Sequence, residues 1–159
     1  MVIQKFSITF AVQLINYNMN YTHHFTHLNY LAIAAGAAAY FLLGAIWYSP
    51  LLFAKPWAKI TGMDLNDPNK SKGMATMMVG SFICFFILAI GMSFLSHALH
   101  LQSWASSLRF GLLTGVCFGI TVMSVGFVYE RRPMMLYAID GAYHLIGNVI
   151  VAIIVTVWK

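Results

Sequence analysis

Three polar residues near the end of the chain are its strongest candidates for chemistry. Asp140, His144 and Asn148 are spaced four residues apart, so in a helix they form one polar stripe, with Tyr137 beside it. The spacing also puts Asp140 within reach of His144. An ionisable side chain at membrane depth is costly, so it normally faces the protein interior and has a partner. Such a stripe can relay protons, hold a cation or bind a polar ligand. The alternative is a hydrogen-bond network that only fixes helix packing.

The composition around this stripe is that of an integral membrane protein. Of the 159 residues, 60% are hydrophobic and 8% are charged, whereas about a quarter of the residues in a soluble domain are charged. The net charge of +5 comes from short connectors rather than from a patterned basic face, so no nucleic-acid partner is indicated. The two cysteines lie in apolar runs, where thiols pack like small hydrophobic groups. They indicate neither a disulfide nor a metal site.

Four stretches are long enough to cross the hydrocarbon core of a bilayer as helices, which takes about 20 apolar residues. They cover residues 29–48, 74–95, 106–129 and 134–158. We therefore predict an all-α polytopic membrane protein, a four-transmembrane-helix bundle in which residues 29–159 form a single domain.

Residues 1–28 form an N-terminal extension ahead of this domain. The first eighteen are mildly apolar but are interrupted by polar side chains, and they lack the small-residue cleavage site of a signal peptide. They fit either an interfacial helix or an over-long start, in which case Met19 is the biological first residue.

The uneven distribution of lysine and arginine predicts the orientation. The first connector, residues 50–72, carries four lysines and the third, residues 130–133, carries two arginines, whereas the second has neither. The positive-inside rule puts the first and third connectors in the cytoplasm and both termini outside it. The expected location is a cell membrane, the bacterial inner membrane.

The stretch WYSPLLFAKPW, residues 47–57, joins the first span to its connector. Its Trp-Tyr pair is typical of headgroup depth. Ser49 and Pro50 match an N-cap followed by proline at the first helical position, so we expect a short interfacial helix to start there. Pro56 is expected to kink or restart this helix, and Gly62 to end it.

At this point the chain resembles a known family. The segments GAIWYSPLLFAKPWAKITG and RRPMMLYAIDGAYHLIGNVIVAIIVTVWK are similar to the signature and to the closing segment of domain-of-unknown-function family 1761. The resemblance covers about residues 28–159 and implies a four-span bundle without a particular activity. It adds Tyr143 to the candidate ligand-binding residues. The matched residues are Gly44, Trp47, Tyr48, Ser49, Pro50, Phe53, Trp57 and Gly62, then Asp140, Gly141, Tyr143 and Trp158.

The third span contains glycines at strict four-residue spacing, Gly111, Gly115 and Gly119. Such a groove lets another helix approach closely, either within the chain or between copies. The alternative is a backbone that lines a narrow pathway.

Five histidines fall on the predicted outer side of the membrane. Their spacings suit imidazole ligands for zinc, copper or nickel, but no cysteine or carboxylate joins them. The alternative is a set of solvated interfacial residues. These weak metal candidates are His23, His24, His27, His97 and His100.

No nucleophile motif and no phosphate-binding loop occurs in the sequence. We therefore expect a non-enzymatic protein without a cofactor, which binds or passes a small solute or ion through the polar stripe. Its expected partners are the lipid bilayer and either further copies, meeting at the third-span glycines, or another membrane protein. The alternatives are an accessory or assembly subunit with a purely structural polar network, and an extracytoplasmic metal binder.

Overall fold

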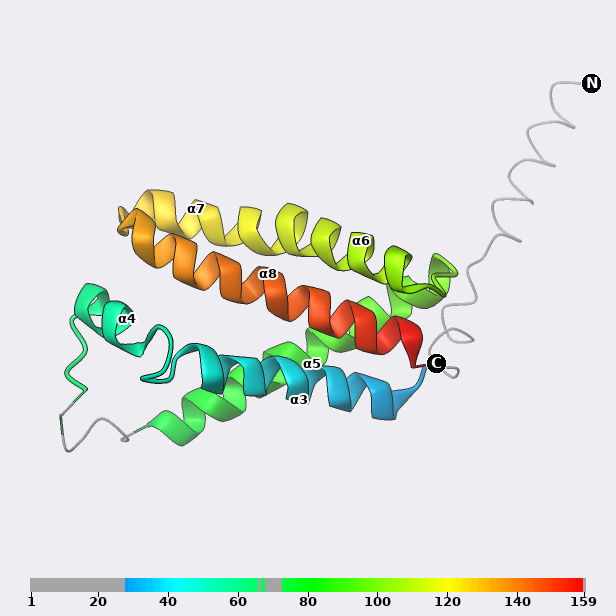
Figure 1. Ribbon diagram of the computed structural model, residues 1–159, viewed down its shortest axis with the longest axis horizontal. Helices are drawn as coiled ribbons and strands as arrows, with labels where there is room; N and C mark the ends of the chain where they lie inside the picture. Colours follow the sequence, from blue (N-terminus) through cyan, green and yellow to red (C-terminus); the bar gives the residue numbers. More distant parts are fainter. Residues whose placement is uncertain (1–27, 66, 68–72, 159) are drawn as a thin grey trace, which may run out of the picture.

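The computed structural model describes residues 28–65, 67 and 73–158, and all regular elements in this part of the chain are helices. In chain order they are α3 (Tyr30–Trp47), α4 (Ala54–Thr61), α5 (Met74–Ala98), α6 (Trp104–Thr114), the π-helix η1 (Gly115–Ile120), α7 (Thr121–Glu130) and α8 (Met134–Val157). Helices α6, η1 and α7 form one continuous rod beside α8, α3 lies along the other side of α8, and α5 crosses α3 obliquely (Figure 1).

Four helices are long and apolar enough to cross a membrane, namely α3, α5, the rod Trp104–Glu130 and α8. They confirm the predicted all-α fold with a short helix after the first span. The rod begins before the predicted boundary because Ser103 and Ser106 form a capping box, in which each side chain bonds the other's backbone N–H. Residues 1–27, with both readings of the extension, lie outside the described residues.

Helix α8 is the centre of the bundle, since it contacts α3, α5, α6 and η1. Val151 and Val155 of α8 are buried, and a Cβ added at Gly36 of α3 would lie 3.5 Å from Val151 Cγ1. A buried hydrogen bond of 2.9 Å joins Ser96 of α5 to Thr156 of α8. Because lipid tails are as apolar as the bundle core, this close packing and these polar contacts hold the helices together.

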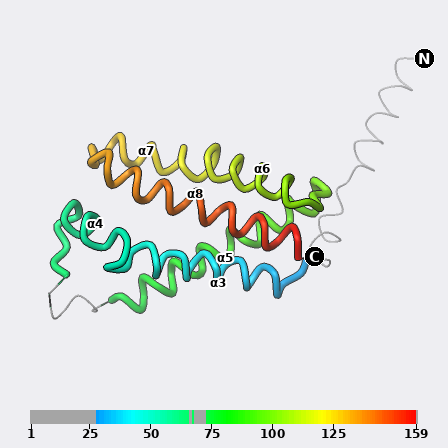
Figure 2. The backbone as a smooth tube through the Cα atoms, viewed as in Figure 1, coloured from blue at the N-terminus to red at the C-terminus, as the bar shows by residue number. Residues whose placement is uncertain are grey.

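The first span begins at the end of the bundle where the last span ends (Figure 2). Asn29 caps α3, since its Oδ1 accepts a 3.0 Å hydrogen bond from the Ala32 N–H, and its Nδ2 donates to the Trp158 carbonyl at 3.3 Å. The described chain therefore enters and leaves the bundle on one side.

The third-span glycines pack against α8 of the same chain. A Cβ at Gly111 would lie 2.7 Å from Val149 Cα, and a Cβ at Gly115 would lie 2.8 Å from Leu145 Cδ1. Of the two expected alternatives, these glycines follow the contact within the chain, because α8 occupies the face that a second copy would need. Gly119 is less tightly packed, at 3.6 Å from the amide nitrogen of Asn148.

The short helix α4 starts later than the sequence predicted. Ser49 does not cap it; its Oγ accepts from the Leu51 N–H at 3.3 Å in a turn, and the helix begins at Ala54. Pro56 therefore lies in the first helical turn, where its missing N–H costs nothing, so it does not kink the helix. Gly62 ends α4 in the left-handed conformation (φ 73°), as predicted.

The glycine packing predicts that Gly111→Ala destabilises the protein whereas Gly126→Ala does not. The added methyl group at Gly111 meets the α8 backbone, and such overpacking costs about 1–3 kcal/mol. Gly126 has open space around it, so alanine there is neutral or improves helix propensity. Unfolding of the purified protein by denaturing detergent measures both variants, and equal stability of the two contradicts this packing.

Candidate functional site

One face of α3 carries alternating glycines and tyrosines at four-residue spacing: Gly36, Tyr40, Gly44 and Tyr48. This spacing aligns the four residues along the helix, and the face lies against α8. Each tyrosine hydroxyl reaches a polar group of α8. The glycines leave room for α8 side chains, since a Cβ at Gly44 would lie 2.8 Å from the Tyr143 hydroxyl oxygen.

The first of these contacts joins the end of α3 to the carboxyl group of α8. The Tyr48 hydroxyl donates a 2.7 Å hydrogen bond to Asp140 Oδ1. Next to it, the Trp47 indole N–H donates to the Ile139 carbonyl at 3.1 Å. The aromatic pair expected only to mark the headgroup region therefore also docks the first span onto the fourth.

The second contact lies two turns deeper in the bundle. The Tyr40 hydroxyl is 2.6 Å from His144 Nδ1, and the Tyr40 ring stacks on Phe85 of α5 with ring centroids 4.0 Å apart. Tyr40 is almost completely buried. It packs so closely on Gly147 that a Cβ there would overlap the tyrosine ring.

The predicted stripe is therefore divided among different partners. Asp140 is bound by Tyr48 and His144 by Tyr40. Asn148 is buried, donates to the His144 carbonyl at 2.7 Å, and lines a separate cavity of about 340 Å³ beside Gly119. Asp140 and His144, which the spacing places within reach of each other, form no hydrogen bond with each other in the described structure. Each is bound instead by a tyrosine of the first span.

The remaining sequence candidates lie in different places. Tyr137 points to the third span, where its hydroxyl is 2.7 Å from Ser124 Oγ. Trp57 lies edge-on to Tyr48 and Phe53 lies against Trp47, so the interface motif is one aromatic cluster.

The metal candidates are only partly within the described chain. His97 and His100 lie at the end of α5, whereas His23, His24 and His27 lie outside the described residues. Within residues 28–65, 67 and 73–158, no group of three or more His, Cys, Asp or Glu side chains is arranged to hold a metal ion.

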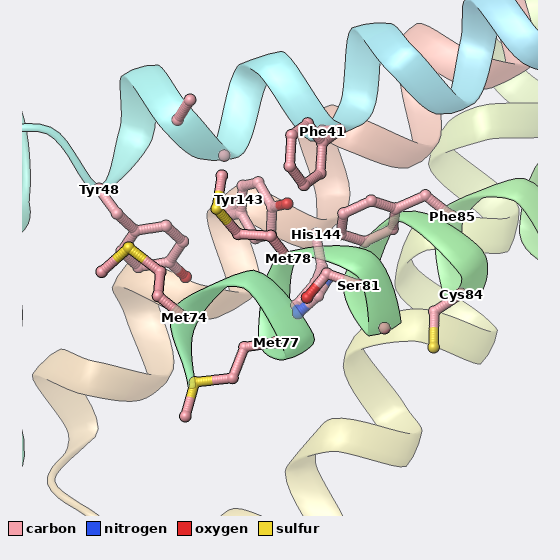
Figure 3. Close-up of a pocket in the computed structure, with 13 residues that line it drawn as sticks. Phe41, Tyr48, Met74, Met77, Met78, Ser81, Cys84, Phe85, Tyr143 and His144 are labelled. Atoms are coloured by element: carbon pink, nitrogen blue, oxygen red, sulfur yellow. The ribbon is translucent and has the colours of Figure 1, made fainter. Parts of the chain in front are cut away.

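A cavity of about 790 Å³ opens between α3 and the N-terminal half of α5 (Figure 3). Tyr48, Ser81, Tyr143 and His144 contribute polar groups to its lining, and the rest is almost wholly apolar. Figure 3 shows Met74 and Met78 extending toward the tyrosine rings, whereas Met77 extends away from them. Because all cavity-lining residues of α5 from Met74 to Cys84 are exposed, the cavity opens sideways toward the region that lipid occupies.

Two polar groups of α8 at the inner wall of this cavity remain available for a ligand. Among the described residues, no hydrogen bond reaches the Tyr143 hydroxyl or Nε2 of His144. When Tyr40 donates to Nδ1, the imidazole carries its proton on Nε2 and presents an N–H donor; when Tyr40 donates to the His144 carbonyl at 3.4 Å, Nδ1 donates to Tyr40 and Nε2 is an acceptor. Of the sequence candidates on α8, His144 and Tyr143 line the cavity. Asp140 does not line it, but it accepts a hydrogen bond from Tyr48, which does.

Sequence reasoning missed Tyr40, Phe85 and the methionines of α5. The signal for Tyr40 was present, since it lies four residues from both Gly36 and Gly44 on the first span. The methionines had no such signal, because a lipid-facing helix and a cavity wall have the same composition.

The tyrosine contacts predict that Tyr48→Phe and Asp140→Ala, which removes the acceptor, are energetically coupled. Each single change removes the same 2.7 Å hydrogen bond, so the double variant loses less stability than the sum of the two. Interhelical hydrogen bonds within membranes contribute about 0.6–1.7 kcal/mol, which sets the expected coupling. Unfolding of the four proteins in detergent measures it. The control combines Tyr48→Phe with Ser96→Ala, whose partner is Thr156, and the two effects should add. Zero coupling between the changes at Tyr48 and Asp140 would contradict their contact.

Comparison with known proteins gives a family but no characterised relative. No curated protein and no solved structure matches the chain. A family model matches residues 31–156, which span all four membrane helices, the tyrosines of α3 and the polar groups of α8. The chain therefore belongs to the family described as "Protein of unknown function (DUF1761)".

Proposed function

We propose that the protein binds a small amphipathic molecule from the bilayer in the cavity between α3 and α5, in a non-enzymatic role. The observation that carries the proposal is the combination of an apolar, sideways-opening cavity with two unused polar groups at its inner wall, on Tyr143 and His144. Ligand sites are typically apolar concavities in which a few polar groups fix the orientation of the molecule.

The polar end of the ligand is expected to meet His144. The Tyr40 hydrogen bond fixes the orientation of the imidazole, and close packing of Tyr40 on Gly147 and Phe85 leaves the ring little freedom to turn. A hydroxyl group suits Nε2 in either tautomer, since it can both accept from an N–H and donate to a bare nitrogen. The Tyr143 hydroxyl can serve as a second contact because it lines the same cavity.

The apolar end is expected to lie against α5. Met74 and Met78 line the cavity with Phe85, and methionine side chains are flexible and polarisable, so they adapt to ligands of irregular shape. A ligand that enters from the bilayer needs no aqueous path, which agrees with the scarcity of polar lining groups.

Passage of an ion or solute across the membrane has less support than binding. A pathway needs polar groups that line one continuous space. The polar stripe does not, since His144 lines one cavity, Asn148 lines another and Asp140 is bound by Tyr48.

The accessory-subunit alternative is favoured by a different observation, since the Tyr40 and Tyr48 contacts would fix helix packing without any ligand. The metal-binding alternative rests on histidines that lie mostly outside the described residues.

Filling the cavity should remove the bound molecule. Ser81 lines the cavity whereas Ile83, on the same helix, does not, and both are exposed. Organic extracts of purified wild-type protein, Ser81→Phe and Ile83→Phe are compared by mass spectrometry. We expect a near-stoichiometric amphiphile in the wild type and in Ile83→Phe, and at least about a tenfold loss in Ser81→Phe, since lost contacts of about 1.4 kcal/mol suffice for that factor. Equal loss in both variants, or no bound amphiphile in the wild type, overturns the proposal, whereas the accessory role predicts that neither variant changes the extract.

We also propose that both termini are extracytoplasmic in a bacterial inner membrane, with residues 50–72 and 130–133 in the cytoplasm. In a background with Cys84 and Cys117 changed to serine, Gln102→Cys should react with a membrane-impermeant maleimide in intact cells, and Asp67→Cys should react only after lysis. The reverse pattern inverts the topology, and reaction of both in intact cells contradicts the alternation of the spans.

A further inference from the structure

A second cavity, of about 450 Å³, lies at the turn between α7 and α8. Its polar lining comes from Arg131, Arg132, Ser124 and Tyr137. Neither the polar stripe nor the proposed amphiphile site uses it. We infer that this cavity binds the phosphate group of an anionic phospholipid, with the arginines as ligands and the apolar wall as a seat for the acyl chains.

The backbone turn holds both arginines at the cavity. Arg131 ends α7 in the left-handed conformation (φ 52°), and the Arg132 N–H donates to the Phe127 carbonyl at 3.2 Å. The Arg132 guanidinium lies over the Phe127 ring, 5.5 Å from its centroid, while its Nε bonds Glu130. The other guanidinium nitrogens of Arg132 remain available as donors, because the ion pair is made through Nε.

The local charge remains positive after this ion pair is counted. Arg131 forms no ion pair within the described part of the chain, so two guanidinium groups face one carboxylate. The C-terminus of α7 and the N-terminus of α8 meet at this turn, so their helix dipoles offset each other and the positive charge comes from the arginines. Arginine forks bind the oxygens of phosphate and carboxylate groups in a bidentate manner, so these side chains indicate an anionic ligand.

The apolar wall distinguishes a lipid from a soluble phosphate. Phe127, Val128 and Met134 line the same cavity, and Val128 and Met134 are among the most exposed large hydrophobic residues in the described part of the chain. A free phosphate would leave these side chains unused, whereas acyl chains that descend from a headgroup at the arginines would cover them. Basic pockets between membrane helices near the interface are typical sites of anionic lipid headgroups.

The test measures lipid preference on the full-length protein. Native mass spectrometry of the protein released from detergent is used to titrate phosphatidylglycerol and phosphatidylcholine with identical acyl chains. We expect the wild type to prefer phosphatidylglycerol, and Arg131→Gln/Arg132→Gln to lose about tenfold of that preference, since each basic side chain near the surface contributes a several-fold factor. If the double variant does not fold, Arg131→Asn alone is used, because asparagine tolerates the left-handed backbone and Arg132 keeps its partner.

The matched control removes two other positive charges. Lys55 and Lys59 lie on α4, at the same end of the bundle as the α7–α8 turn (Figure 1), but neither lines the cavity. Lys55→Gln/Lys59→Gln is expected to keep the preference, and an equal loss would show general surface attraction and overturn the site. Glycerol 3-phosphate is added as a soluble competitor at millimolar concentration. Failure to displace phosphatidylglycerol supports the lipid, and complete displacement would assign the cavity to a soluble phosphate instead.

Discussion

The structure depends on satisfying two ionisable side chains of α8 without water. Within a bilayer, an unpaired carboxyl or imidazole group costs several kcal/mol, so a neighbouring helix must provide a partner at each position. Tyr48 provides one for Asp140 and Tyr40 provides one for His144. Because these contacts are short and directional, they set the depth and the rotation of α3 against α8. The glycines between and opposite the tyrosines follow from this, since the rings need space on both helices.

The cavity is a consequence of the same arrangement. Helix α8 is already covered on one side by α3 and on the other by α6 and η1, so α5 packs mainly through its C-terminal half, where Ala89, Met92 and Ser96 are buried. Its N-terminal half has no buried residue from Met74 to Cys84. The space left between that half and α3 ends at His144 and Tyr143, so the polar groups that fix the fold also form the inner wall of the cavity.

The sequence predicted the fold well and part of the contacts around the candidate site. Apolar run length and the Asp140–His144–Asn148 spacing identify the spans and the buried face of α8, because both depend on local periodicity. The partners of that face could not be derived in the same way, since a tyrosine near the end of a span also fits interfacial anchoring. The sequence also did not predict the π-helix in the third span, because nothing in GVCFGI distinguishes it from an α-helix. Its wider turn changes which residues beyond Gly115 face α8.

The difference between a packing network and a binding site lies in which atoms the network uses. A contact that only fixes packing needs one nitrogen of His144, and Tyr40 occupies Nδ1. If packing were the whole requirement, a tyrosine–amide pair would serve as well, without the cost of an ionisable ring at membrane depth. An imidazole held through Nδ1 and open to a cavity through Nε2 uses one nitrogen for structure and leaves the other free for the ligand that we propose. This division of the ring, rather than the presence of a histidine, is the strongest physical argument that α8 does more than hold the bundle together.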